Sequence, residues 1–154
     1  MTLTDISRDA SISISAQADH SLANRRESAS AVYRAAATVG LMGIALIHLL
    51  DLPGKWEEVR YLGVGYVLVI AAALVLAEIN ATRHDPRALL AGAGLAALVI
   101  VGFVINRTVG MPNAKDDIGN WSEPLGLASL FVEFVTLWAC LRAWRSGARA
   151  HAIN

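Results

Sequence analysis

The residues of this chain that could do chemistry are ionisable side chains embedded in apolar runs. Glu133 lies within PLGLASLFVEFVTLWACLRAW, Arg107 near the end of ALLAGAGLAALVIVGFVINRTV, and His48 and Asp51 near the end of AAATVGLMGIALIHLLDL. An ionisable group inside a membrane span costs about 2.5 to 3.5 kcal/mol on insertion scales, so it is kept where it binds, pairs or carries a proton. These four residues therefore form the candidate site.

Glu133 is the strongest of these candidates. Counted from Pro124 at about 1.5 Å per residue, it lies roughly 14 Å deep, near the midplane of a bilayer. Ser129, Thr136 and Cys140 share its helical face, which we expect to look into a helix bundle. Two interpretations stay open: a carboxylate that carries a proton or binds a ligand, and a carboxyl that is neutral or paired and locks helices together.

His48, Asp51 and Arg107 lie near the same end of their apolar runs. His48 and Asp51 are three residues apart and share a helical face, an arrangement that orients a general base or a metal-bound histidine. Asp51 could instead cap a helix break at Pro53. Arg107 could extend to the lipid headgroups or turn inward and pair with Asp51, Glu123 or Glu133. We favour binding for His48 and inward pairing for Arg107.

Four more residues are assigned to the edge of this cluster: Asn106, Trp121, Glu123 and Ser129. Asn106 and Ser129 share helical faces with inward-looking positions. Trp121 also fits the belt of tryptophan and tyrosine that is common at membrane interfaces, which is the alternative explanation for it.

Four apolar stretches position these residues. A spanning helix needs roughly 20 mostly apolar residues, and residues 35–52, 61–80, 88–109 and 124–144 qualify. Charged residues make up 17% of the chain, against about 25% in soluble domains. Short connections favour antiparallel neighbours. The sequence therefore predicts an all-α fold, a four-helix transmembrane bundle with up-down-up-down connectivity.

The bundle is predicted over residues 34–146, between two polar segments. Residues 1–33 are serine-rich, lack the apolar core of a signal peptide and are predicted to be a disordered cytoplasmic tail; residues 147–154 are predicted to be a second one. Cytoplasmic flanks hold the excess of basic residues, which here are Arg8, Arg25, Arg26, Arg34, Arg83, Arg87, Arg142, Arg145 and Arg149. We expect a multi-pass protein of the cell membrane with both termini in the cytoplasm and acidic turns outside.

Small residues predict where the helices touch, because close approach replaces the hydrophobic drive in lipid. They recur at helical spacing as Ala88, Gly92 and Ala96 in one span and as Ala36, Gly40 and Gly43 in another. The two outward turns also share the order proline, tryptophan, acid and Leu-Gly. This order indicates either two repeated helical hairpins or a chance match of interfacial tryptophans.

Several function classes have no support in the sequence. Cys140 is the only cysteine, so an internal disulfide and a CxxC pair are excluded. Of the histidines only His48 is expected in the membrane, which argues against a haem held by two histidines, and HExxH, GxSxG and Walker motifs are missing. The zero net charge gives no reason to expect nucleic acid. We favour a non-enzymatic protein and assign no cofactor or metal.

Three motifs follow one another across the second outward turn and the last span: RTVGMP from Arg107, GNWSEPLG from Gly119 and SLFVE ending at Glu133. In this RTxGxP…WxEPLG…SLxxE pattern the chain resembles a loosely defined group of small, uncharacterised bacterial four-span integral membrane proteins. The likeness covers roughly residues 35–143. It implies a four-span topology and an interest in His48, Arg107 and Glu133, and no reaction. Lys55 stands where we would expect a second polar or histidine ligand, which weakens a metal site.

The sequence supports three hypotheses about function. In the first, the outward-facing polar cluster binds a small ligand, a proton or a metal cation, which predicts that His48, Asp51, Arg107 and Glu133 converge. In the second, the chain is an accessory or scaffold subunit of a membrane complex or a homo-oligomer. In the third, it is a small proton-coupled transporter, which would need a dimer to build a pathway. The lipid bilayer is a partner in each case.

Overall fold

The computed structural model describes residues 3–83 and 85–151 of the chain. Within these ranges the chain forms four helices and no strand: α1 (Leu3–Glu58), α2 (Arg60–Thr82), α3 (Pro86–Thr108) and α4 (Pro124–His151). Each is long and apolar enough to cross a membrane, the qualifying part of α1 being Gln17–Glu58. The predicted all-α four-helix bundle is confirmed.

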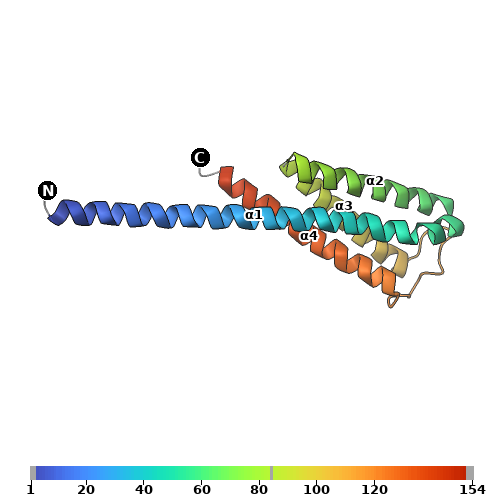
Figure 1. Cartoon of the computed structure of the whole chain (residues 1–154). Helices are drawn as coiled ribbons and strands as arrows, with labels where there is room; N and C mark the ends of the chain where they lie inside the picture. Colours follow the sequence, from blue (N-terminus) through green and yellow to red (C-terminus); the bar gives the residue numbers. More distant parts are fainter. Residues whose placement is uncertain (1–2, 84, 152–154) are drawn as a thin grey trace.

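The helices are arranged as a square with up-down-up-down connectivity. α1 packs against α2 and α4, and α3 packs against α4 and more weakly against α2. The turn between α1 and α2 and the loop between α3 and α4 lie at one end of the bundle, and the two termini lie toward the other (Figure 1). The loop at residues 109–123 is the longest connection. Polar residues from both connections therefore meet at one end.

Helix α1 is longer than the span predicted within it. Its backbone is helical from Leu3, and no glycine or proline occurs before Gly40. The disordered cytoplasmic tail over residues 1–33 stays a prediction. The sequence also predicts a break at Pro53, but this proline lies inside α1. Pro86 and Pro124 do begin helices, where a missing amide costs least.

The C-terminal tail prediction, residues 147–154, overlaps α4, which continues to His151. Residues 1–2 and 152–154 lie outside the described residues. Placement of both tails in the cytoplasm stays a prediction, as do the repeated hairpins.

Small residues bring the helices together as predicted. A Cβ built on Gly40 would collide with the Thr136 side chain of α4, and one built on Gly43 would lie 3.0 Å from Val132. On α3, Gly92 is buried between Leu41 and Cys140. Large apolar side chains instead cover the outside, among them Leu46, Leu50, Leu68, Leu98, Phe131 and Phe134. Outward apolar faces on spanning helices identify a multi-pass membrane protein.

The contact between Gly40 and Thr136 can be tested by adding one methyl group. We expect Gly40→Ala to lower the free energy of unfolding by about 1 to 3 kcal/mol, because the added methyl group would collide with the Thr136 side chain. The Cα of Thr136 is also in tight contact with that methyl group, so α1 and α4 would have to separate. The measurement is thermal unfolding in mild detergent. The matched control is Gly94→Ala, since a Cβ on Gly94 meets nothing within 4 Å. Equal melting temperatures for the two variants would contradict this packing.

Candidate functional site

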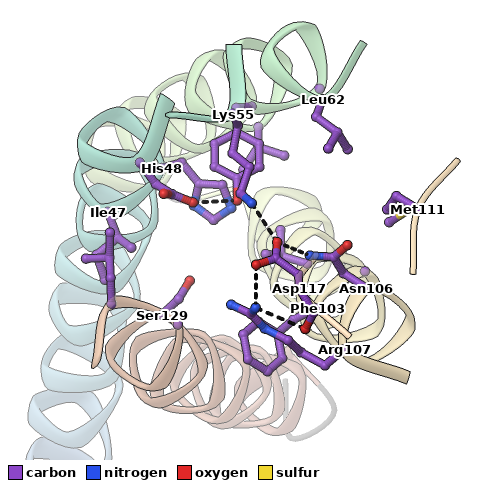
Figure 2. Close-up of a pocket in the computed structure, with 18 of the residues that line it drawn as sticks. Ile47, His48, Lys55, Leu62, Phe103, Asn106, Arg107, Met111, Asp117 and Ser129 are labelled. Atoms are coloured by element: carbon purple, nitrogen blue, oxygen red, sulfur yellow. Dashed lines mark hydrogen bonds and ion pairs between the residues drawn. The ribbon is translucent and has the colours of Figure 1, made fainter. Parts of the chain in front are cut away.

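A cavity of about 340 Å³ lies between the helices at the end of the bundle where the connections meet. His48, Asp51, Arg107 and Glu133 all line it, as do the secondary candidates Asn106, Glu123 and Ser129. Figure 2 shows His48, Asn106, Arg107 and Ser129 around this cavity. The four main candidates therefore line one cavity, and their role as a binding site stays a proposal. Trp121 is the exception among the candidates, because it is half exposed and packs edge-on against Phe103 at 6.1 Å between ring centroids.

The cavity runs from partly exposed charged groups to a sealed inner end. The side chain of Glu123 at the loop is 35% exposed, that of Asp117 is 16% exposed, and Glu133 at the opposite end is 0% exposed. Between these ends lie Val69, Val99 and other apolar wall residues. The cavity thus has a charged mouth, apolar sides and a polar floor.

Arg107 holds the mouth together from the last turn of α3. Its side chain is only 4% exposed, and its Nη1 donates to Asp117 Oδ1 at 2.7 Å. Its Nη2 pairs with Glu123, and its guanidinium lies 5.1 Å from the centre of the Phe103 ring. The predicted inward pairing is confirmed with Glu123, whereas Asp117 takes the place expected for Asp51 or Glu133.

Asp117 is the centre of this arrangement. Lys55 Nζ donates to Asp117 Oδ2 at 2.6 Å, and Asn106 Nδ2 donates to the same oxygen at 2.9 Å. Lys55 also pairs with Glu58 at 2.7 Å. We call this set the mouth network: Lys55, Glu58, Asn106, Arg107, Asp117 and Glu123. It joins α1, α3, the loop and the segment before α4.

The electrostatics of the mouth network favour an ionised Asp117. Burial by itself raises the pKa of this carboxyl. The hydrogen bonds from Lys55 and Asn106, together with the charges of Lys55 and Arg107, outweigh burial, so the pKa of Asp117 lies below its ordinary value.

His48 and Asp51 form the middle of the cavity but do not pair as their spacing predicts. Tyr66 Oη donates to Asp51 Oδ2 at 2.9 Å. His48 Nδ1 lies 2.9 Å from the carbonyl oxygen of Ile44, which can only accept, so Nδ1 carries a proton. When the ring is neutral, Nε2 is therefore an acceptor. Asp51 caps no helix end, because α1 continues past it.

Glu133 forms the floor. Ser129 Oγ donates to Glu133 Oε1 at 2.5 Å, while Glu133 Oε2 is buried without a hydrogen-bond partner. None of the ion pairs in the described part of the chain includes Glu133. The interpretation of Glu133 as half of an ion pair that locks helices together therefore has no support.

Three residues that line the cavity were not among the candidates from the sequence: Tyr66, Asp117 and Lys55. Tyr66 could have been suspected, because it places a hydroxyl group within an apolar run. Asp117 and its exposed neighbour Asp116 look alike in sequence, and only the loop conformation separates them. Lys55 follows the first apolar stretch directly, where a lysine is common at the end of a membrane span, so its position does not indicate a role in the site.

Metal binding gains no support from the geometry, because the described residues contain no group of three or more His, Cys, Asp or Glu side chains that could hold an ion.

Comparison with protein-family models, curated proteins and solved structures finds no match for the chain. The resemblance in the RTxGxP pattern thus stays a prediction. The fold and cavity define the class, a multi-pass membrane protein with a polar cavity at one end.

The mouth network can be tested through Asp117. We expect Asp117→Ala to lower the free energy of unfolding by about 1.5 to 3 kcal/mol, because it leaves Lys55 and Arg107 short of a charged acceptor. The control is Asp116→Ala, which changes an exposed carboxylate. Denaturant titration in detergent measures both. A network that carries no stability would leave the two variants alike.

The same variant predicts a pH dependence. Because folding lowers the pKa of Asp117, its contribution is fully present above the unfolded pKa of about 4 and is lost as the pH falls through the folded pKa. We expect the gap in melting temperature between wild type and Asp117→Ala to narrow as the pH falls below about 4. Melting curves from pH 7 to pH 2 measure this gap, and a constant gap would show that the charge of Asp117 is irrelevant.

Proposed function

We propose that this chain is a membrane protein whose cavity faces the outside of the cell and binds a small ligand. One observation carries the proposal: His48, Asp51, Arg107 and Glu133, which are far apart in sequence, line a single cavity of about 340 Å³. That volume is within the range of about 300 to 1,000 Å³ typical of ligand pockets. The bias of basic residues toward the opposite flanks supports the outward orientation.

The hydrogen bonds divide the cavity into a supporting part and a part with spare capacity. In the mouth network, Lys55 and Arg107 each contact two carboxylates, so their charges are already used. Deeper in, Nε2 of His48 and Oε2 of Glu133 are left without a partner by the contacts described above. We infer that the mouth network holds the opening and that the deeper groups contact the ligand.

The apolar walls fit the rest of a ligand. Val69, Val99 and Leu125 line the cavity. Apolar walls with a few placed polar groups are the usual composition of a small-molecule site, because burial supplies affinity and the polar groups supply orientation. The ligand that fits is therefore a small molecule with an apolar body and a polar group.

The other hypotheses have weaker support. An accessory subunit predicts small-residue faces left exposed, whereas Gly40, Gly43 and Gly92 pack inside the chain. A metal site lacks a set of ligands among the described residues. A proton carried by Glu133 fits the buried carboxyl and can accompany ligand binding.

Filling the cavity tests the proposal. Gly65 and Gly102 line the cavity, and a Cβ on either meets nothing within 4 Å, so Gly65→Leu and Gly102→Leu extend side chains from positions with free space. Binding of 2-phenylethanol, 2-phenylethylammonium and phenylacetate is measured by calorimetry in nanodiscs, with empty nanodiscs subtracted. We expect at least one probe to bind wild type at least tenfold more tightly than either filled variant.

The control for this experiment is Gly94→Leu, because Gly94 also has free space but is exposed outside the cavity. It should bind like wild type. If no probe binds, or if filling the cavity changes nothing, the proposed function is overturned.

A further inference from the structure

The inner half of the cavity, by which we mean the part beneath the mouth network, contains carboxyl groups that form no ion pair. Asp51 and Glu133 both line it, yet Asp51 is held by the hydroxyl of Tyr66 and Glu133 by the hydroxyl of Ser129. The cations that line the cavity, Lys55 and Arg107, are occupied by the acidic residues of the mouth network. Among the described residues, therefore, two carboxyls face the cavity without forming an ion pair.

In this inner half, the side-chain hydrogen-bond donors have partners, whereas some acceptors do not. Its donors are all used: Tyr66 Oη by Asp51, Ser129 Oγ by Glu133, and the Nδ1 proton of His48 by a backbone carbonyl. What remains is Nε2 of His48, an acceptor in the neutral ring, and Oε2 of Glu133, an acceptor when the carboxyl is ionised. A ligand that satisfies these acceptors must bring donors.

Packing between α1 and α4 places these acceptors in order of depth. Gly40 lies against Thr136 and Gly43 against Val132 in antiparallel helices, so Glu133 lies close to the level of Ile44 and inward of His48. Glu133 is 0% exposed, and its Oε2 has no partner although it lines a cavity. An unpartnered carboxyl oxygen this deep costs free energy that a bound donor would recover.

We propose that the ligand of this cavity is a small organic amine that binds as a cation, with its ammonium group against Glu133 and its apolar body along the walls. This inference rests on the proposed function. An ammonium carries three donors and a positive charge, so it meets both the acceptors and the unbalanced carboxyls, and hydrogen bonds between charged groups are about twice as strong as neutral ones. An anion would meet Asp51 and Glu133 with like charge, and an alcohol would supply a single donor.

Probes with one carbon skeleton and three head groups test this inference at pH 7. In nanodiscs of phosphatidylcholine, we expect 2-phenylethylammonium to bind wild type at least tenfold more tightly than 2-phenylethanol, and phenylacetate to show no binding. We expect Glu133→Gln to weaken binding of the ammonium at least tenfold and to change binding of the alcohol less than threefold. Glu57→Gln, an exposed carboxylate outside the cavity, is the control and should bind like wild type.

The outcomes separate this inference from the proposed function. If the alcohol or the carboxylate binds at least as tightly as the ammonium and loses binding in Gly65→Leu, the cavity binds ligands but the amine is wrong. If no probe binds, both proposals are overturned. The preference among the three probes is measured on wild type, so the inference stays falsifiable even if Glu133→Gln does not fold.

Discussion

The burial of Arg107 between two carboxylates is the interaction on which the outer half of the structure depends. A guanidinium that is 4% exposed near the end of a span needs charged partners, and it receives Asp117 from the loop and Glu123 from the segment before α4. Asp117 then reaches Lys55 on α1. The backbone of Arg107 also accepts a hydrogen bond from Gly119 N at 2.9 Å. Through Arg107 and Asp117 the long loop is tied to α1, α3 and the segment before α4.

A change in packing along the bundle explains why a cavity lies beneath this loop. In the inner half, small residues let the helices approach closely, as at Gly40 against Thr136 and Gly92 against Cys140. In the outer half, Gly65 and Gly102 line a space in which an added Cβ meets nothing within 4 Å. Gly40 and Gly92 thus allow close contact between helices, whereas Gly65 and Gly102 leave a space that no neighbouring side chain fills. The mouth network spans the wider end without filling it.

The sequence was sufficient for the four apolar helices and for singling out two buried ionisable residues. Length and hydropathy specify a helix that crosses a membrane, and the cost of burying charge singles out Arg107 and Glu133 regardless of the fold. Helical spacing also placed Ser129 and Glu133 on one face, and the structure joins them by a hydrogen bond.

The sequence was insufficient where local geometry decides between neighbours. His48 and Asp51 do share a face, but the partner of each was set by what lies opposite, a carbonyl oxygen for one and Tyr66 for the other. Asp117 turns inward because the loop bends at Gly110 and Gly119, both with φ of 80°, and at Asn113 with φ of 61°. The path of the loop depends on all of these left-handed residues together, and the hydrophobic periodicity of the sequence does not predict it. Pro53 lies inside α1, and the turn beyond it packs through Trp56 against Gly63 of α2, a contact that the sequence does not reveal.

The position of the cavity within the bundle bears on what a bound cation could do next. At the level of Glu133, the core closes with Ile44, Ala73 and Ala96, each 0% exposed. The lining of the cavity includes none of these residues, and the groove around Arg34 and Asn80 at the other end of α1 and α2 shares no residue with it. A cation that reached Glu133 in a single chain would therefore meet a packed wall, because close-packed interiors admit a ligand only by moving side chains or helices. This arrangement favours retention over passage, so it supports a binding protein more than a transporter built from one bundle.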